Sequence, residues 1–428
     1  MKKNFSMKIN KRTAWATLAL MMATAGMCSC SSNDTEDKPL SNEDNKPIEL
    51  TLTRAEQDLV NESNDFAFNL MRQVSTPPTD GQKEKSIILS PISITYALGM
   101  LNNGAAGETQ QQINQVLGFG ETGADGINDF CRKMLTAAPS LDKLTKVMIA
   151  NTIFINKNYN ILPDFLQKAK RYYDAEPETR DFHDGKTLDV INQWASDHTE
   201  EMITKVLDPD SFSPYAVSYL LNAIYFKGAW AQKFSKDDTR DEAFEGAGKK
   251  VPMMHQEHEF GYTEDELCQV LNLPYGNGSY TMTILLPREG KTTDDVLQKL
   301  DKENWKRYLL TYPAIVDVKL PRFESNTDQN LNEIMTKLGM PLAFTDFAEF
   351  PFFCDQPTKI GMMKQVARIK LNEEGTEAAA VTVIGMIETT STNHEPRRIE
   401  FHATRPFLYI ISEQQSGAIF FIGKYVGD

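Results

Sequence analysis

The order of two hydrophobic patterns along this chain limits the folds that it can adopt. Apolar residues recur with helical spacing in four stretches, at residues 65–74, 93–102, 126–136 and 188–198. Runs typical of β-strands gather in the second half, at residues 281–286, 314–320, 366–371, 406–411 and 418–422. Because helices and strands do not alternate regularly, the pattern predicts an α+β fold with large antiparallel sheets rather than repeated parallel units.

The first 29 residues have the pattern of a secretory signal peptide. Five basic residues and no acidic residue precede or flank an uncharged apolar stretch at residues 14–27, which is too short to span a bilayer comfortably. Cys30 follows the small Ser29, whereas Cys28 follows the bulkier Met27, and this arrangement resembles the lipobox of bacterial lipoproteins with Cys30 as the lipid acceptor. An ordinary signal peptide with two incidental cysteines is the alternative.

Residues 30–55 are predicted to form a lipidated, acidic and disordered tether, because polar and charged residues dominate their first part. Removal of the signal leaves 40 basic residues against 59 acidic ones, a net charge of −19. Such a charge excludes nucleic acid as a partner and leaves the lipid as the only attachment to a membrane. Residues 31–37 also resemble the acidic export signal of Bacteroidetes lipoproteins, which implies an exported protein anchored at the outer membrane, surface-exposed or extracellular.

The sequence offers little support for an enzyme, a cofactor or a metal site. An odd number of cysteines follows the lipobox, namely Cys131, Cys268 and Cys354, so no disulfide framework is expected. His255 and His258 have a spacing that metal ligands can have, but solvated or locally bonded histidines are favoured because no cysteine cluster accompanies them. Residues 118–123 fit a dinucleotide fingerprint, but they follow a helical pattern and therefore favour a glycine loop that ends a helix.

The segment from Glu373 to Met386 is unusual in its alternation. It begins with acidic and small residues, continues with β-branched ones and is followed by the polar residues 389–393. With a period of two, one face holds no charge and consists of Thr376, Ala378, Ala380, Thr382, Ile384 and Met386. A short alanine-rich helix and a permanent interior strand fit the pattern as well.

Nine short motifs stand in an order that resembles the serpin family of serine protease inhibitors, between Leu59 and Asp428. They lie at residues 90–93, 104–109, 151–154, 191–194, 222–230, 251–254, 320–323, 372–380 and 405–407. The resemblance implies a single domain at residues 56–428, with three β-sheets, eight or nine helices and an exposed reactive-centre loop at about residues 373–400. Length alone would have suggested two or three domains.

The resemblance also implies the activity. In inhibitory serpins a protease attacks the loop and forms an acyl-enzyme, and the cleaved loop then inserts into the main sheet and distorts the protease. We therefore expect a monomeric suicide inhibitor of secreted serine endopeptidases, with cysteine proteases as further candidates, and not an enzyme. A non-inhibitory serpin that acts as a carrier or chaperone is the alternative.

Insertion requires small, uncharged side chains on the inward face of the hinge, because a buried unpaired charge is costly. The matching hinge residues are Glu373, Gly375, Thr376, Glu377, Ala378, Ala379 and Ala380. The shutter, which holds the sheet closed, is matched by Ser90, Ser93 and Asn222, with Gln365 in place of the usual histidine. The breach, where the hinge enters the sheet, is matched by Trp230 and by Arg322, which is expected to form a salt bridge with Glu373.

The attacked bond is expected between Thr389 and Thr390, which suggests an elastase-like protease. Because the loop is longer than in common serpins, Met386, Ile387 and Thr392 are alternatives. The helix that binds heparin in some serpins matches residues 126–140, which contain two basic residues with acidic residues beside them. We expect no heparin activation.

Overall fold

A computed structural model describes residues 46–75, 83–120, 122–376 and 397–428, and these form one compact unit. The described residues contain nine α-helices: α1 (Arg54–Val74), α2 (Pro91–Asn102), α3 (Gly107–Val116), α4 (Gly123–Ala137), α5 (Pro163–Tyr173), α6 (Lys186–Asp197), α7 (Thr293–Lys299), α8 (Lys302–Leu309) and α9 (Asn332–Leu338). The expected α+β fold class is confirmed, and the nine helices of the described residues agree with the expected eight or nine.

Fifteen strands accompany the helices in the described residues. They are β1 (Ile87–Leu89), β2 (Thr145–Asn156), β3 (Ala175–Arg180), β4 (Ser218–Ala229), β5 (Arg240–Ala243), β6 (Lys250–Glu264), β7 (Cys268–Tyr275), β8 (Tyr280–Pro287), β9 (Tyr312–Pro321), β10 (Phe323–Asn330), β11 (Lys364–Asn372), β12 (Gly375–Thr376), β13 (Arg398–His402), β14 (Phe407–Glu413) and β15 (Ile419–Tyr425). All four helices and five strands predicted from periodicity are present.

Hydrogen bonding organises these strands into two sheets. The six-stranded sheet has the order β10-β11-β12-β4-β2-β3, and the nine-stranded sheet runs β1-β15-β14-β8-β7-β6-β9-β13, with β5 beside β6. The resemblance implied three sheets. Two of them are continuous here because the long strand β6 pairs with β9 over most of its length and with β7 near its end.

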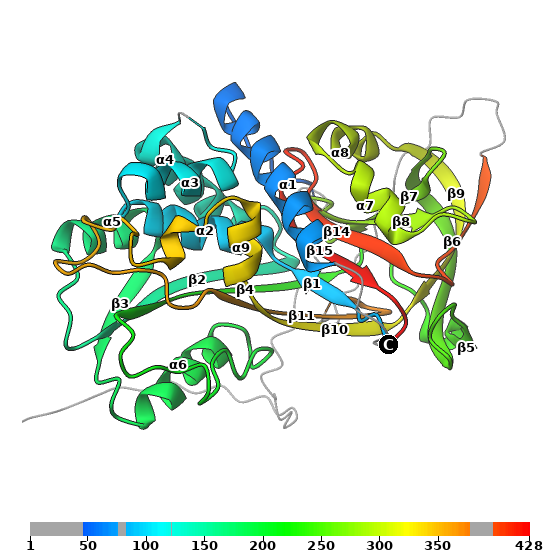
Figure 1. The fold of residues 1–428 in the computed structure, drawn as a ribbon. Coiled ribbons are helices and arrows are strands. Elements are labelled where there is room, and N and C mark those ends of the chain that lie inside the picture. The colour runs from blue at the N-terminus through cyan, green and yellow to red at the C-terminus, as the bar shows by residue number, and fades with distance from the viewer. Residues whose placement is uncertain (1–45, 76–82, 121, 377–396) are drawn as a thin grey trace, which may run out of the picture. The chain divides into compact units, whose positions relative to one another are not determined.

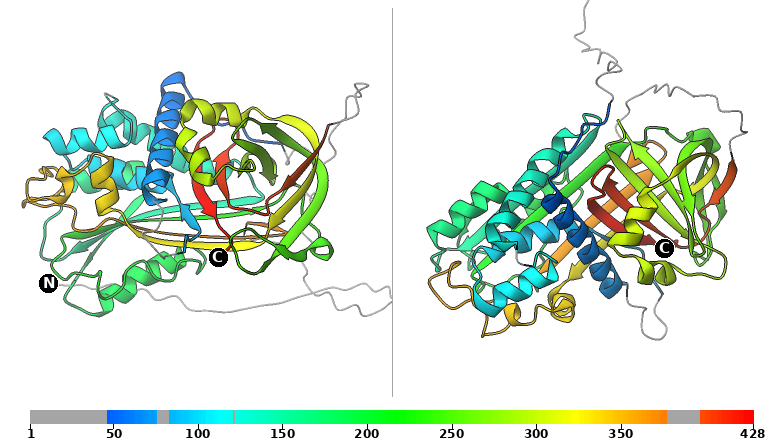
Figure 2. Two further views of the ribbon diagram at one scale, coloured as in Figure 1. Left: turned by 45° about the vertical axis from the view of Figure 1, so that its right-hand side comes forward. Right: turned by 90° about the horizontal axis from the view of Figure 1, so that it is seen from above.

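The six-stranded sheet lies between helices. Figure 1 shows α6 on one face of this sheet and α2, α3 and α5 on the other, and Figure 2 shows the same layers from two further directions. This arrangement buries the residues of α2 almost completely, because the helix lies inside the molecule between the sheet and its neighbours.

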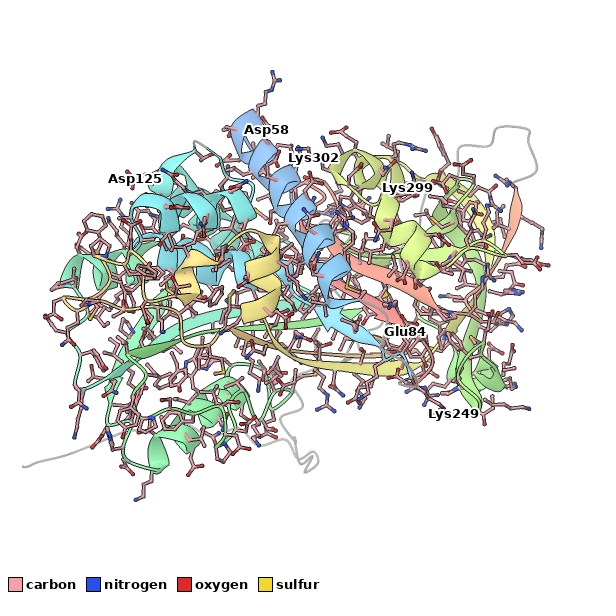
Figure 3. All side chains as sticks on the ribbon, in the orientation of Figure 1. Asp58, Glu84, Asp125, Lys249, Lys299 and Lys302 are labelled. Atoms are coloured by element: carbon pink, nitrogen blue, oxygen red, sulfur yellow. The ribbon has the colours of Figure 1, made fainter. Side chains whose placement is uncertain are left out.

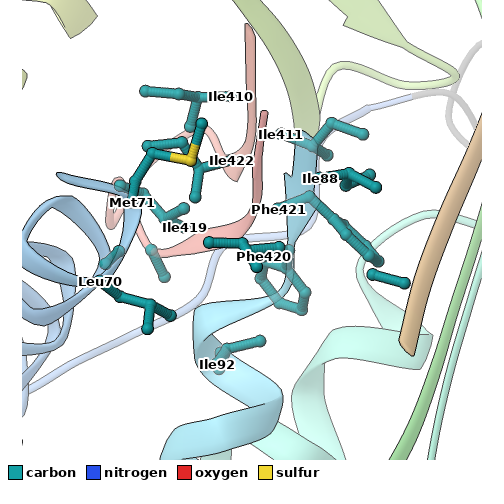
Figure 4. Packing of buried hydrophobic residues seen from close by; sticks show 14 of the residues in the cluster. Leu70, Met71, Ile88, Ile92, Ile410, Ile411, Ile419, Phe420, Phe421 and Ile422 are labelled. Carbon is teal, nitrogen blue, oxygen red and sulfur yellow. The ribbon is translucent and has the colours of Figure 1, made fainter. Parts of the chain in front are cut away.

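The main core joins the nine-stranded sheet to α1 and α2. Leu70 and Met71 of α1 pack near Ile419 and Ile422 of β15 (Figure 4), and all four side chains are buried. In contrast, Asp58, Asp125 and Lys299 lie on the outer sides of their helices (Figure 3) and are exposed. The apolar periodicity of the sequence therefore separates the buried faces of these helices from their exposed faces.

The start of α1 and the end of α3 relate to two of the predictions from the sequence. Helix α1 begins at Arg54, its first turn is closed by a capping box between Thr53 and Glu56, and Leu50 is buried. The folded body therefore begins before residue 56, although the tether was expected to extend to residue 55. Gly118 follows α3 with a φ angle of 72°, so this glycine ends a helix and does not open a dinucleotide site.

Candidate functional site

The six-stranded sheet is open at its centre. The two-residue strand β12 lies between β11 and β4, and its Gly375 and Thr376 pair with both neighbours. Beyond this point β4 and β11 form no backbone hydrogen bonds with each other in the described residues. A cavity of about 690 Å³ separates them instead. We call this opening between β4 and β11 the slot.

The slot passes between the helix layers on the two faces of the sheet. Its lining includes Ser93, Ile94, Ala97, Leu98 and Leu101 from α2, Trp194 and Ala195 from α6, residues 218–223 of β4 and residues 364–366 of β11. Most of these side chains are apolar or small. The slot therefore has the position and the lining that an additional, largely apolar strand requires.

The breach lies at the end of the slot that β12 occupies, and its residues bind the chain immediately before β12. The indole N–H of Trp230 donates to the carbonyl of Asn372 at 3.0 Å, and the Trp230 ring stacks on Tyr275 with the centroids 4.5 Å apart. The carboxylate of Glu373 accepts hydrogen bonds from Thr239 and from Arg322, each at 2.7 Å. The predicted salt bridge between Arg322 and Glu373 is thus present.

The electrostatics of the breach favour ionised carboxylates. The side chain of Glu373 is only 3% exposed, and burial alone would raise the pKa of its carboxyl, but the hydrogen bonds from Thr239 and Arg322 outweigh burial and the pKa is lowered. The hydrogen bond from Lys233, assisted by Lys236, likewise lowers the pKa of Glu374. Two successive glutamates are therefore tied to cations where the chain enters the sheet.

Close packing fixes the conformation of β12. Gly375 has a φ angle of 148°, and a Cβ atom there would lie 2.0 Å from the carbonyl oxygen of Gly228, so only glycine fits. The hydroxyl of Thr376 lies 2.6 Å from the hydroxyl of Tyr275, and Thr376 is 2% exposed. Thr376 therefore occupies the inward face that the alternation of the sequence assigned to it.

The structure brings three of the four predicted shutter residues together. The side-chain amide of Gln365 accepts from the backbone N–H of Ser90 at 3.1 Å and donates to the Ser90 carbonyl at 2.8 Å and to the Ser93 hydroxyl at 3.0 Å. Glutamine thus bonds in both directions, as expected. Asn222 lies on the β4 side of the slot and donates to Asn151 at 2.8 Å.

Asn222 therefore does not join the other shutter residues as the sequence analysis grouped it. Its side-chain oxygen is buried and has no hydrogen-bond partner among the described residues. The slot explains both facts, because it separates Asn222 on β4 from Gln365 on β11. An unpartnered buried acceptor is unfavourable and indicates that a donor is missing at this place.

Other predicted site residues lie outside the described residues. These are the lipidation residue Cys30, the hinge residues Glu377, Ala378, Ala379 and Ala380, and the attacked-bond candidates Met386, Ile387, Thr389, Thr390 and Thr392. The loop expected at residues 373–400 is bounded more narrowly, because Glu373, Gly375 and Thr376 are buried at the breach and residues 398–400 pair with β9 as part of β13.

Sequence reasoning missed several contacts of the hinge. Thr239, Tyr275 and Gly228 each touch it, and Lys233 and Lys236 hold Glu374. Each of these five residues lies more than 100 positions in the sequence from the residue that it contacts, so no local pattern could have found them.

The histidine pair forms no metal centre. The imidazole of His255 lies 2.5 Å from the carboxylate of Asp317, whereas His258 contacts the backbone carbonyl of Glu259. No group of three or more potential ligands that could hold a metal ion exists in the part of the chain that the structure describes. The same part contains no helix that is long and apolar enough to cross a membrane.

Comparisons with known proteins agree with this fold and site. The family model described as "Serpin (serine protease inhibitor)" matches residues 61–427. Serpin B3 of Homo sapiens is 32% identical over 392 residues, which cover 84% of this chain and 97% of that protein. The leukocyte elastase inhibitor of Xenopus tropicalis is 31% identical over 380 residues, with 84% and 97% covered.

Solved structures give the same result. The native thermophilic serpin tengpin superposes with a TM-score of 0.77 at 26% identity and covers 89% of this chain and 96% of its own. A thyroxine-binding globulin in complex with thyroxine superposes with a TM-score of 0.75 at 28% identity and covers 86% of this chain and 98% of its own.

Proposed function

Because the chain belongs to the serpin family, we propose that it is a suicide inhibitor of secreted serine endopeptidases and traps its target by inserting the cleaved loop into the slot. The observation that carries this proposal is β12, which already occupies the first two positions of a central strand, while no other described residue places its backbone in the slot. The hinge is therefore positioned for insertion before any protease arrives.

The register of β12 specifies where each further residue would lie. Thr376 stands opposite Gly228 of β4 and Leu371 of β11, and both pairings are antiparallel. Continued in the same register, Thr382 falls opposite both Asn222 and Gln365. Its hydroxyl is then the donor that the unpartnered oxygen of Asn222 lacks.

The same register brings the attacked bond to the far end of the sheet. Residue 386 falls opposite Ser218, the first residue of β4, so Thr389 emerges beyond the strand. About ten new strand residues, with about 1 kcal/mol for each net hydrogen bond, release on the order of 10 kcal/mol, which is comparable with the stability of a whole domain. That free energy is the source for distorting a protease.

We propose an elastase-like target attacked between Thr389 and Thr390, with Met386, Ile387 and Thr392 as alternative positions and cysteine proteases as further targets. The small β-branched Thr389 suits an elastase-like pocket, and relatives named leukocyte elastase inhibitor support this choice. Binding of heparin is not part of the proposal, because Lys133 of α4 is paired with Glu56 and Arg132 donates to the backbone of Arg171.

A carrier function is the second candidate, because a globulin solved in complex with thyroxine shares this fold. One experiment separates the two functions. The full chain is incubated with elastase, chymotrypsin, trypsin and subtilisin, and the products are separated in SDS. A covalent complex with at least one protease, formed close to one to one, supports the inhibitor. Cleavage of the loop without any covalent complex supports the carrier.

The proposed location rests on the sequence alone. Residues 1–29 would direct export, and Cys30 would carry the lipid that anchors the protein at the outer membrane, surface-exposed or extracellular. An acidic tether after Cys30 would let the inhibitor domain reach proteases outside the cell. A monomer suffices for this function, because hinge and slot belong to one chain.

A further inference from the structure

Two large apolar side chains lie exposed where the reactive loop rejoins the folded body. Leu310 is 69% exposed and Tyr312 is 72% exposed, and they rank among six such residues in the described ranges. We call Leu310 and Tyr312 together the exit patch. Leu310 and Tyr312 are two positions apart in the chain, and exposed apolar side chains that cluster mark an interaction site more often than single scattered ones do.

The exit patch is held on a rigid support. Thr311, between the two exposed residues, is turned inward, where its hydroxyl accepts from the side chain of Asn272 at 3.3 Å and sits over Gly261. A Cβ atom at Gly261 would lie 2.4 Å from that hydroxyl oxygen, so the backbones approach closely. Leu310 and Tyr312 are thereby fixed as a preformed surface, which reduces the entropic cost of binding.

The exit patch also adjoins the anchor of the loop. Tyr312 stands opposite Tyr262 in the pairing of β9 with β6, and the guanidinium of Arg397 lies 5.9 Å from the centroid of the Tyr262 ring. The carbonyl of Arg397 accepts from the backbone N–H of Ile315 at 3.1 Å, and its side chain pairs with Glu264 at 2.5 Å. The loop therefore returns to the body within a few residues of the exit patch (Figure 1, β13 beside β9).

The length of the chain between the attacked bond and Arg397 limits how far from the exit patch an attacking protease can lie. Thr389 precedes Arg397 by eight residues, a span of at most about 26 Å at about 3.3 Å per residue. A domain of about 200 residues has a radius of gyration of about 16 Å, so its diameter exceeds that span. A protease that holds the loop at Thr389 is therefore kept within about 26 Å of Arg397, close enough for its surface to reach the exit patch.

We propose that the exit patch is a secondary docking surface for the attacking endopeptidase, and that it contacts an apolar area beside the part of the active-site cleft that holds the residues following the attacked bond. This inference rests on the proposed function, since it needs the loop to be the protease's substrate. Tyrosine is enriched among the few side chains that dominate binding at interfaces, so Tyr312 is expected to carry most of the effect.

The test compares rates of loop attack. We would measure the second-order rate with pancreatic elastase for the full-length protein, for a Leu310→Ala/Tyr312→Ala variant and for a Phe347→Ala control. Phe347 is a suitable control because it is also a large, 80% exposed apolar side chain. It belongs to a different part of the fold, the segment whose Glu349 bonds to Thr109 of α3. A synthetic peptide of residues 382–397 supplies the rate for a loop that has no exit patch. Thermal midpoints of all variants confirm that each one is folded.

We expect the double variant to be attacked about tenfold more slowly than the parent, the Phe347→Ala control to be unchanged, and Tyr312→Phe to retain most of the parent rate. The stoichiometry of inhibition should stay the same in every variant. An unchanged rate in the double variant would overturn the inference while leaving the trapping mechanism intact. If the parent protein is a dimer that the double variant converts to a monomer, the exit patch is a contact between copies and the inference is also wrong.

The rate comparison tests the exit patch even if the protein does not inhibit its target protease. A protein that is cleaved without forming a covalent complex still has a rate of loop cleavage, and the exit patch should still accelerate it relative to the peptide. Loss of trapping with a retained difference in rate would therefore reject the inhibitor function alone.

Discussion

Thr376 is the residue at which attack and insertion can be separated. It is buried, its hydroxyl contacts Tyr275, and its backbone pairs with two strands at once. A small, uncharged side chain is therefore required at position 376 before the loop is cleaved as well as during insertion. Its neighbour Glu373 is equally buried but charged, and it is tolerated because Arg322 and Thr239 provide partners.

We expect Thr376→Arg to convert the inhibitor into a substrate. The guanidinium would be buried without a partner at the start of insertion, at a cost of several kcal/mol, while the bond after Thr389 keeps its sequence. Elastase should then cleave the loop at a near-normal rate, with a fading covalent band and a steeply rising stoichiometry of inhibition. Glu377→Arg, which places the same side chain on the opposite face of the strand, is the matched control. Undiminished one-to-one trapping by Thr376→Arg would refute insertion through this hinge.

Glu373 should make the breach sensitive to acid. Its pKa is lowered, so its ionised form contributes stability above the ordinary value of 4.5, and this contribution is lost as the pH falls through the lowered pKa. Glu373→Gln should be less stable than the parent at pH 6, by roughly 1 kcal/mol given the partial exposure of Arg322. The difference in thermal midpoint should narrow as the pH falls from about 6 to about 3.5. A difference that does not vary with pH would contradict the role of this carboxylate.

The slot illustrates which features of the six-stranded sheet can be predicted from the sequence and which cannot. Periodicity located β11 on one side of the slot, and the alternation of residues 376–386 identified the inward face correctly at Thr376. The gap between β4 and β11 could not be predicted, because pairing between strands more than 100 residues apart leaves no local pattern. The sequence assigned Asn222 and Gln365 to one shutter, and it could not show that the slot separates them.

A free strand should compete with the loop for the slot. We expect a synthetic peptide of residues 376–388 to bind between β4 and β11, because it supplies both backbone edges and a donor at the position of Thr382. The protein with bound peptide should still be cleaved by elastase but should no longer trap it. The same peptide with Ala380→Arg, which places a charge on the inward face, is the matched control. Equal effects of the two peptides would show that the slot does not select its strand by this face.

Attachment to the membrane concerns the complete chain. If Cys30 carries the lipid, Cys30→Ala should move the protein from the membrane fraction to the soluble fraction, because the acyl chains supply the apolar burial that holds it there. Cys28→Ala is the matched control and should remain with the membrane. The opposite distribution would assign the lipid to Cys28, and two membrane-bound variants would argue against a lipoprotein.

The folded body as a whole stores free energy only if the uncut protein is less stable than the cut one. In the proposed mechanism that store lies in the six-stranded sheet, whose central strand β12 has only two residues among those described, and in the unpartnered oxygen of Asn222. Insertion would add backbone hydrogen bonds along the slot and bury the inward face of residues 376–386. Stability should therefore rise when the loop is cut, whereas cutting a loop in an ordinary protein lowers it or leaves it unchanged.

The thermal midpoint before and after cleavage of the loop tests this claim most directly. A protease that is not trapped cuts the loop near Thr389, the cut protein is purified, and both forms are heated under the same conditions. We expect the midpoint to rise by roughly 10–15 °C, from a gain on the order of 10 kcal/mol in a domain of this size. Thr376→Arg, cut in the same way, should show little of this rise. An unchanged midpoint in the cut parent protein would contradict insertion, and with it the inhibitory mechanism proposed for this chain.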